Sequence, residues 1–294
     1  DEPLRIDIWV SFVDRCPRAS SPGMAEAAGF ALLRVPLWHA HTCMCHYGAV
    51  SSKRVVAVIQ ARTGSSRLPR KVLRPLAGRP VLEWMVRAAR EAHGVDEVVI
   101  ATSTASNDDE VEALGSQLGV RVVRGSEDDV LSRFMLALEA TDADAVVRLT
   151  ADCPLCDPAL ISAIVSMWKV DPTLDYVATT LIRTLPRGLD VELASRNALQ
   201  IADAEAESFH RIHVTSYLYD SKSAFRTMGL VVQPAANDLR VTLDTAEDGQ
   251  LLDAVVAELG DQPPAWQDVV SLLRSRPDIV QINAKIRQKK LADG

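Results

Sequence analysis

The sequence predicts an α/β protein built on a doubly wound, mostly parallel sheet with helices on both faces. Short, unbroken apolar runs recur along the chain, as expected for strands that are buried on both faces. Amphipathic stretches of about ten to fifteen residues separate these runs, as helical crossovers separate parallel strands. Small and charged residues follow several of the runs, where the loops at the edge of such a sheet are expected.

The alternation is regular in the first half of this region. Apolar residues on one face predict a helix that begins at Pro80, and Gly119 is placed to end the next helix. Ser126 and Asp129 have the spacing of a capping box that opens a third helix. We expect strands at 55–59, 98–101, 120–123 and 145–149, with helices at 80–93, at 108–118 and from 126 through Leu138.

The second half is less regular. A helix is expected from Asp157-Pro158 to Trp168, and residues 176–191 are interpreted as strand pieces and a loop. Asp244-Thr245 is placed to cap a helix at 246–259. Further helices are expected at 195–207, 213–219, 266–274 and 283–290, with a strand at 239–243.

The composition excludes several classes of protein. Of the 294 residues, 48% are hydrophobic and 24% are charged, enough for a full core. The formal net charge of −7 argues against nonspecific nucleic-acid binding, because that binding depends on neutralising phosphates with many cations. No apolar run approaches the ~20 residues that span a bilayer. The five scattered cysteines form no disulfide framework and suit a reducing cytoplasm.

The loop after the first strand is rich in cations and small residues. Arg62, Gly64, Ser65 and Lys71 belong to it, together with Arg67, Arg70 and Arg74. Gly64 is suited to backbone angles that are closed to other residues, and backbone N–H groups with Arg and Lys suit a polyphosphate. A solvated basic turn is the alternative. Neither a P-loop nor a GxGxxG fingerprint is present.

Two carboxylates are expected at the same edge of the sheet. Asp152 follows one predicted strand at its carboxyl end, and Asp244 follows the strand predicted at 239–243. Such a pair suits Mg²⁺, which takes one or two carboxylates together with phosphate oxygens and waters. The alternative is that each aspartate caps a nearby helix.

Six motifs in order carry a family resemblance. They are IQARTGSSRLPRKVLRPLAGRPVLEW at 59–84, RGSEDDVLSRF at 124–134, VVRLTADCPLCDP at 146–158, RGLDVE at 187–192, HVTSY at 213–217 and LRVTLDTAEDGQLL at 239–252. Together they resemble the cytidylyltransferases that activate acidic sugars, most closely the spore-coat polysaccharide biosynthesis branch. This branch is related to the acylneuraminate and 3-deoxy-manno-octulosonate cytidylyltransferases. The resemblance runs from about residue 53 to the C-terminus.

The resemblance implies transfer of CMP from CTP to an acidic sugar or related anionic acceptor, with Mg²⁺ bound and pyrophosphate released. It implies Arg62, Lys71 and Asp152 as catalytic residues and Asp152 and Asp244 as the metal ligands. For the nucleotide it implies the Ala61 backbone, Arg62, Gly64, Ser65, Lys71, Ser126 and Asp129, with cytosine at Ala61, Ser126 and Asp129. Capping explains the Ser126 and Asp129 side chains equally well.

The acceptor is expected at Arg187, Asp190, Glu192 and His213. By the resemblance, the acidic side chains take sugar hydroxyls and Arg187 pairs with a carboxylate or phosphate. Solvation of these side chains in a loop is the alternative. The chain reads FHRIHVTSY where the family usually reads EREHVTPY, which puts the acceptor contacts in question. His213 is a candidate proton acceptor, with a structural role as the alternative. Cys153 and Cys156 form a C-x-x-C, and a redox pair would need exposure and a helix N-terminus.

The resemblance does not reach residues 1–52. We expect these residues to be a poorly ordered extension or upstream sequence translated from an early start, and residues 53–294 to form the nucleotidyltransferase domain. Within 1–52, the C-x-C and H-x-H spacings of Cys43, Cys45, His39 and His41 do not fit a zinc finger.

Two other functions stay open from the sequence. A glycosyltransferase that uses a nucleotide sugar also places aspartates and Mg²⁺ after a central strand. A non-catalytic nucleotide-binding protein is the other alternative. Members of the resembled family often form dimers, so a homodimer is one expected assembly, and neither nucleic acid nor a membrane is expected as a partner.

Overall fold

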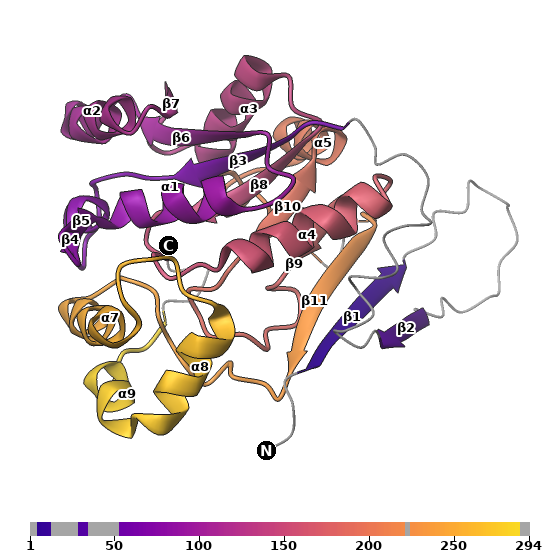
Figure 1. The fold of residues 1–294 in the computed structure, drawn as a ribbon. Coiled ribbons are helices and arrows are strands. Elements are labelled where there is room, and N and C mark those ends of the chain that lie inside the picture. The colour runs from indigo at the N-terminus through magenta and orange to yellow at the C-terminus, as the bar shows by residue number, and fades with distance from the viewer. Residues whose placement is uncertain (1–4, 13–28, 35–52, 221–223, 289–294) are drawn as a thin grey trace, which may run out of the picture.

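A computed structural model describes residues 5–12, 29–34, 53–220 and 224–288 (Figure 1). The strands are β1 (Arg5–Phe12), β2 (Gly29–Arg34), β3 (Val55–Gln60), β4 (Pro75–Leu76), β5 (Arg79–Pro80), β6 (Glu97–Ser103), β7 (Arg121–Gly125), β8 (Ala145–Thr150), β9 (Tyr176–Ala178), β10 (Glu192–Ser195) and β11 (Thr227–Gln233). The α-helices are α1 (Val81–Glu91), α2 (Asp109–Gln117), α3 (Val130–Thr141), α4 (Pro158–Val170), α5 (Arg196–Glu205), α6 (Phe209–His213), α7 (Ala246–Leu259), α8 (Trp266–Ser275) and α9 (Pro277–Asn283), with short 3₁₀ helices η3 (Lys71–Leu73) and η4 (Ser106–Asp108).

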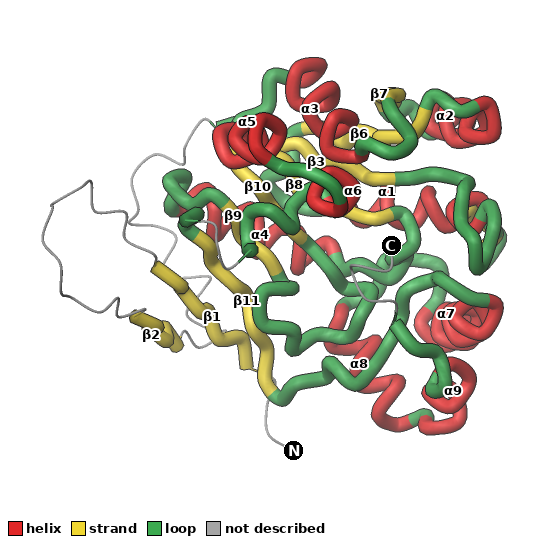
Figure 2. Tube along the Cα trace, turned by 180° about the vertical axis from the view of Figure 1, so that it is seen from behind, coloured by secondary structure: helices red, strands yellow, loops and turns green. Residues whose placement is uncertain are grey.

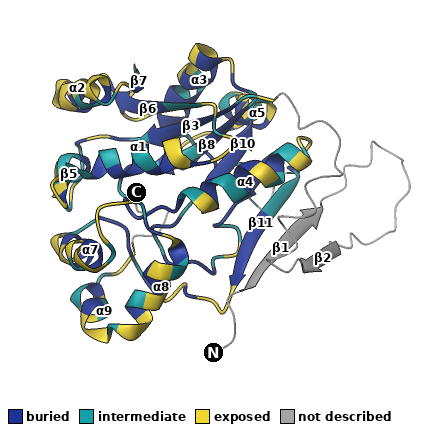
Figure 3. Ribbon diagram, viewed as in Figure 1, coloured by how far each residue is buried: buried dark blue, intermediate teal, exposed yellow. Residues whose placement is uncertain are grey.

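The described strands form a large sheet in the order β2-β1-β11-β9-β10-β8-β3-β6-β7, and β4 pairs with β5 separately. Neighbours in the segment β8-β3-β6-β7 are all parallel. Alternating residues of β3 enter different cores: Ala57 and Ile59 pack with α1 and α4, whereas Val56 and Val58 pack with α3 and α5. Figure 3 shows these central strands as buried. The predicted doubly wound α/β fold with helices on both faces is confirmed.

The order of the parallel strands locates a crevice. The chain runs from β3 outward through β6 to β7 and then returns to place β8 on the other side of β3. Ligands of open α/β sheets bind outside the carboxyl ends of the strands where the order reverses. In this protein that position lies between the loops that follow β3 and β8, which contain Arg62 and Asp152.

Part of the sheet was not predicted. β10 runs antiparallel to both β8 and β9, and β11 is parallel to β9. Two segments of the predicted extension 1–52, β1 and β2, form an antiparallel ladder on β11 (Figure 2). The Cys43 and His41 cluster lies outside the described residues, and the boundary at residue 53 stays a prediction.

Several local predictions are wrong. Residues 239–243 form no strand, only a bridge between Arg187 and Arg240, so hydrogen bonds other than a ladder fix this segment. A helix was expected at 213–219, but α6 ends at His213. A helix was also expected to begin at Asn283, but α9 ends at that residue. Gly64 does not adopt a left-handed conformation, whereas Arg70 does, with φ 60°.

One predicted helix cap differs in the structure, and another is confirmed. Asp129 is the N-cap of α3 and accepts a hydrogen bond from the Ser132 N–H, so Ser126 is not the cap. For α7, Thr245 is the N-cap and forms a capping box with Asp248. No helix in the part of the chain that the structure describes is long and apolar enough to cross a bilayer.

Candidate active site

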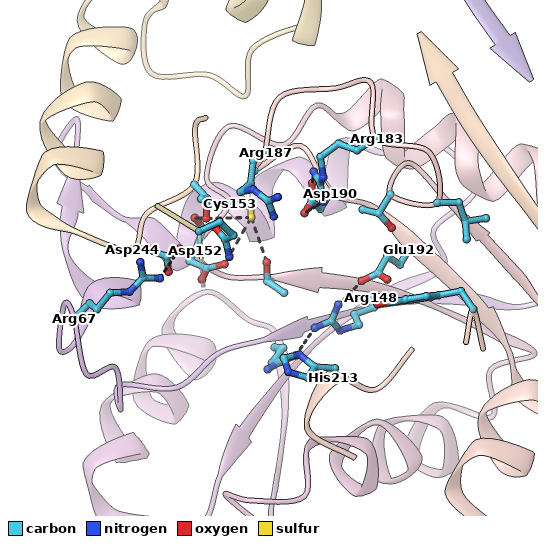
Figure 4. A pocket seen from close by; sticks show the side chains of 18 residues that line it. Arg67, Arg148, Asp152, Cys153, Arg183, Arg187, Asp190, Glu192, His213 and Asp244 are labelled. Atoms are coloured by element: carbon cyan, nitrogen blue, oxygen red, sulfur yellow. Dashed lines mark hydrogen bonds and ion pairs between the residues drawn. The ribbon is translucent and has the colours of Figure 1, made fainter. Parts of the chain in front are cut away.

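A cavity of about 740 Å³ opens at the predicted crevice (Figure 4). Its two ends differ in chemistry. We call one the carboxylate end, formed by Asp152 and Asp244 with Lys71, Arg67 and Arg240. We call the other the arginine end, formed by Arg148, Arg183 and Arg187 with Asp190 and Glu192. Except for Lys71 and Arg240, these residues all line the cavity.

Lys71 joins the two aspartates of the carboxylate end. Its Nζ lies 2.6 Å from Asp152 Oδ2 and 2.7 Å from Asp244 Oδ1. Burial lowers the pKa of Lys71, but the two carboxylates outweigh burial and raise it above the usual value. The structure therefore brings these three residues together from distant segments of the chain.

The turn after β8 places Asp244 beside Asp152 without a strand. The Leu243 N–H donates to the Asp152 carbonyl at 2.8 Å, and Thr242 Oγ1 donates to the same oxygen at 3.2 Å. The helix-capping alternative does not account for either aspartate, because Asp157 caps α4 and Thr245 caps α7. Both carboxylates are therefore available for ionic contacts in the cavity.

A buried ion-pair network orients Asp244. Arg240 Nη2 lies 2.8 Å from Asp244 Oδ2, and Arg240 Nε lies 2.9 Å from Asp248 Oδ1. Asp248 is fully buried and also accepts the Asp244 N–H at 2.9 Å. Burial raises the pKa of Asp244, but Lys71, Arg240 and Arg67 together lower it to about 2. Asp244 is thus held ionised in a fixed orientation.

The two aspartates fit a divalent cation that arrives with phosphate. Among the described residues, no group of three or more His, Cys, Asp or Glu side chains surrounds a common metal position. Mg²⁺ does not need such a group, since one or two carboxylates suffice when phosphate oxygens and waters complete the octahedron. The donors present suit a metal–nucleotide complex better than a resident structural ion.

At the arginine end, two of the three arginines have protein partners. Arg183 makes a two-pronged pair with Asp190, at 2.6 and 2.9 Å. Arg148 pairs with Glu192, which also accepts from the Tyr176 hydroxyl. Thr215 Oγ1 donates to the same carboxylate at 2.8 Å. Glu192 is therefore engaged on several sides by the protein itself.

Arg187 is the exception. Its backbone bonds to Leu239 and Val241, and Gly188 follows at φ 105°, where a Cβ would meet the Thr242 nitrogen at 2.6 Å. No hydrogen-bond or ion-pair partner for its guanidinium lies in the described ranges. Burial lowers the pKa of Arg187, and the neighbouring charge of Arg183 lowers it further. Arg187 thus presents a guanidinium in the cavity that the nearby charge of Asp190 compensates only in part.

His213 lines the same cavity from a strained turn. The next residue, Val214, is buried with φ 56°, a costly conformation for a β-branched side chain. Here the chain departs from the family motif at His210, Ile212 and Ser216, and two of these three positions meet: His210 Nδ1 lies 2.9 Å from Ser216 Oγ. This contact, with that of Thr215 to Glu192, holds the turn that presents His213.

The residues expected to hold the base and the triphosphate in the loop after β3 do not line the cavity. Ala61 is buried and donates its N–H to the Ala101 carbonyl, and Arg62 is exposed. Ser65 Oγ accepts weakly from Leu68 N–H at 3.4 Å. None of these residues, nor Gly64, lines the cavity. Their roles stay predictions, whereas Arg67, Arg148 and Arg183 line the cavity without having been assigned.

Ser126 and Asp129 are engaged in local contacts. Ser126 Oγ accepts the Asp129 N–H at 3.1 Å. Asp129 also pairs with Arg211 at 2.7 Å. Their predicted contact with cytosine is untested.

Arg133 on α3 was not among the predicted site residues. Its side chain is fully buried, yet all three of its nitrogens lack a hydrogen-bond partner. Burial lowers the pKa of Arg133, and nearby Arg62 lowers it further. The side chain lies against Gly125, where a Cβ would meet its Cγ at 2.9 Å. An arginine inside the apolar stripe of a predicted helix was the only signal in the sequence.

The C-x-x-C motif does not form a reactive pair. Cys153 and Cys156 are free and buried. Burial raises the pKa of both thiols, and neighbouring aspartates raise it further. A redox thiol needs exposure and a lowered pKa, so Cys156 is placed here as a small hydrophobic residue rather than as a redox group.

Comparison with known proteins decides the family. The family model described as cytidylyltransferase matches residues 56–262. The chain belongs to the cytidylyltransferase family. It is 35% identical over 233 residues to the spore coat polysaccharide biosynthesis protein SpsF of Bacillus subtilis, covering 76% of this chain and 95% of that protein.

Other relatives agree. The chain is 36% identical over 180 residues to the 3-deoxy-manno-octulosonate cytidylyltransferase of Acidobacterium capsulatum, covering 60% of this chain and 68% of that one. A solved cytidylyltransferase from Leptospira borgpetersenii superposes with a TM-score of 0.76 at 27% identity, covering 80% of this chain and all of that chain. The protein is therefore a nucleotidyltransferase, and this membership favours nucleotidyl transfer over the two alternative functions.

Proposed function

We propose that this cytidylyltransferase joins CMP from CTP to an acidic sugar or a related anionic acceptor, with Mg²⁺ bound and pyrophosphate released. The observation that carries the proposal is the contact of Lys71 with both Asp152 and Asp244 at the carboxyl edge of the sheet. Three segments of the chain bring one cation and two carboxylates to the place where such sheets bind nucleotides.

The reaction divides between the two ends. At the carboxylate end, Lys71 and Arg67 bind the triphosphate and stabilise the charge that builds up on departing pyrophosphate. Asp152 and Asp244 would hold Mg²⁺, which neutralises phosphate charge when bound. An acceptor hydroxyl oxygen forms a bond to the α-phosphorus, the bond from that phosphorus to the β-phosphate bridging oxygen breaks, and His213 accepts the hydroxyl proton.

Arg187 fixes the anionic group of the acceptor. It is the cavity arginine without a partner in the described part of the chain, whereas Arg183 and Arg148 are paired with Asp190 and Glu192. A carboxylate or phosphate would supply the missing counter-charge in a two-pronged geometry. Because the protein already occupies much of Glu192 and Asp190, they contribute to the acceptor site mainly by orienting the arginines.

Arg133 is our candidate for selecting cytosine. The contacts with cytosine predicted from the sequence are at Ala61, Ser126 and Asp129, and we add Arg133 to them. Its side chain is buried against Gly125 at the end of β7. Its guanidinium only donates hydrogen bonds. Cytosine presents two adjacent acceptors, O2 and N3, whereas uracil has an N3–H donor beside O2. We therefore expect Arg133→Met to reduce the preference for CTP over UTP about tenfold or more.

The same substitution has a structural signature. Because it removes a buried guanidinium that the protein does not pair, Arg133→Met should leave the melting temperature unchanged or raise it. Thermal unfolding and CTP/UTP competition on the same samples separate the two effects. A variant that unfolds at markedly lower temperature while keeping the nucleotide preference would remove Arg133 from the base site.

Pyrophosphate release tests the proposal directly. The protein is incubated with each of CTP, UTP, ATP and GTP, with and without Mg²⁺, and with acidic sugars such as 3-deoxy-manno-octulosonate or with neutral sugars. We expect release only with CTP, Mg²⁺ and an anionic acceptor. Hydrolysis of a UDP-sugar without release from CTP would instead support a glycosyltransferase. A homodimer and a cytoplasmic location stay predictions.

A further inference from the structure

We propose that Lys71 occupies the metal position in the ligand-free protein, so that the metal binds only together with nucleotide phosphates that draw Lys71 away. This inference rests on the proposed function, since it takes Asp152 and Asp244 as ligands of a nucleotide-bound metal. It adds an order of events: the carboxylates alone are not a metal site, and the incoming nucleotide completes one.

The oxygen atoms of Asp244 are all in use. Lys71 Nζ lies 2.7 Å from Oδ1, while Arg240 and Arg67 lie 2.8 and 3.0 Å from Oδ2. Lys71 also lies 2.6 Å from Asp152 Oδ2. A divalent cation about 2.1 Å from these oxygens would contact the ammonium nitrogen, because both would need the same space between the carboxylates. One cation must leave before the other can bind.

The charge of the carboxylate end favours this exchange over simple addition. Three carboxylates, Asp152, Asp244 and Asp248, face three cations, Lys71, Arg67 and Arg240. The sum is zero, so a lone divalent cation would leave a net positive charge among half-buried groups. A nucleotide triphosphate brings the negative charge that accommodates both the metal and the displaced ammonium.

Lys71 is the cation best able to move. Arg240 is anchored by a second, fully buried carboxylate, Asp248, through Nε and Nη2, and Nη1 bonds to Gln288 at 2.6 Å. Lys71 has one charged atom on a flexible stem, and its contacts in the cluster are the two carboxylates themselves. A short swing takes its ammonium from the carboxylates to neighbouring phosphate oxygens while η3 stays in place.

The inference predicts the nucleotide-free metal affinity. Mn²⁺ binding is measured by electron paramagnetic resonance on the full chain, with no nucleotide, for wild type, Lys71→Met and Lys169→Met. Lys169 is the matched control. It lies on α4, away from the cavity, where its Nζ donates to the Gly94 carbonyl at 3.0 Å, and its substitution removes the same charge. We expect Lys71→Met to bind Mn²⁺ at least about tenfold more tightly than the other two proteins.

A second measurement needs no variant. In wild type, a non-hydrolysable CTP analogue should tighten Mn²⁺ binding at least about tenfold, and Mn²⁺ should tighten analogue binding by the same factor. Thermal unfolding verifies that Lys71→Met is folded. If Lys71→Met is not folded, the coupling between Mn²⁺ and the CTP analogue in wild type decides the inference. Equal Mn²⁺ affinity in wild type and folded Lys71→Met, or no coupling, would overturn it. Failure of CTP turnover with the Mn²⁺ results intact would overturn the proposed function alone.

Discussion

The two ends of the cavity treat charge differently. At the carboxylate end, Lys71 is shared between two aspartates that lie 81 and 173 positions away in the chain. At the arginine end, Arg183 and Asp190 are seven positions apart, and Arg148 faces Glu192 directly across the β8–β10 ladder. The first set of contacts depends on the assembled fold, whereas the second set is built into one loop and one strand pair.

This difference separates exchangeable charges from fixed ones. The contacts of Lys71 are made to groups that would bind the metal, so ligand binding replaces them. Glu192 is fixed by Arg148, Tyr176 and Thr215 and has little capacity left for a ligand. Only Arg187 among the arginines of this end awaits a partner. The carboxylate end is thus expected to rearrange when ligands bind, whereas the arginine end is expected to act as a preformed anion receptor.

The largest effect should come from the carboxylate end. Asp152→Asn keeps the shape of the side chain but removes its charge, so metal-dependent pyrophosphate release should fall at least about a hundredfold. Circular dichroism should show an unchanged fold, because Asp152 caps no helix. Asp278→Asn, which alters an exposed pair with Arg276, is the control. Activity within a few fold of wild type would remove Asp152 from the site.

At the arginine end, Arg187→Gln should raise KM for the acceptor about ten- to a hundredfold, as expected for loss of a charged hydrogen bond. The kcat and the affinity for CTP should change little. Arg183→Gln offers the contrast, because it leaves the Asp190 carboxylate unpaired and should lower the melting temperature as well. Equal acceptor KM in Arg187→Gln and wild type would place the acceptor elsewhere.

Acid should weaken the carboxylate end through Asp244. Its pKa is about 2 in the folded protein and about 3.9 when unfolded, so the stabilisation is present above pH 4 and is lost as the pH falls toward 2. We expect about 2 kcal/mol of unfolding free energy to depend on this group. Urea unfolding between pH 5 and pH 2.5 should show a smaller loss for Asp244→Asn than for wild type. Parallel curves would contradict this assignment.

The smallest effect should come from the thiols beside Asp152. Because burial raises the pKa of Cys153 and Cys156, these two thiols should react with iodoacetamide far more slowly in native protein than in urea. Diamide followed by dithiothreitol should leave activity unchanged. Rapid labelling of Cys153 in the native protein, detected by mass spectrometry, would reopen the redox interpretation.

Most of the fold could be predicted because local patterns carry it. Unbroken apolar runs mark β3 and β6, an apolar run interrupted by Arg148 marks β8, and Gly119 ends the helical segment after α2 at φ 62°. The same patterns gave wrong predictions where long-range contacts determine the local structure. Residues 239–243 alternate between apolar and polar side chains as a strand does, yet hydrogen bonds to Arg187 and to the Asp152 carbonyl hold them instead.

The candidate site shows the same division. Asp152, Asp244 and Lys71 stand in motifs, so they could be proposed before their contacts were visible. Arg148 and Glu192 become partners only through the register of an antiparallel pair that no local pattern encodes. Arg133 differs again, because its burial without a partner is a property of tertiary packing. Paired and unpaired charges therefore had to be distinguished from the structure.

A structure of the protein with a non-hydrolysable CTP analogue and Mn²⁺ tests the central claim most directly. We predict Mn²⁺ between the Asp152 and Asp244 carboxylates, the triphosphate beside it, and Lys71 Nζ moved from the two aspartates to a phosphate oxygen. A nucleotide bound away from the carboxylate end, or Lys71 still between the two aspartates with the nucleotide in place, would contradict it.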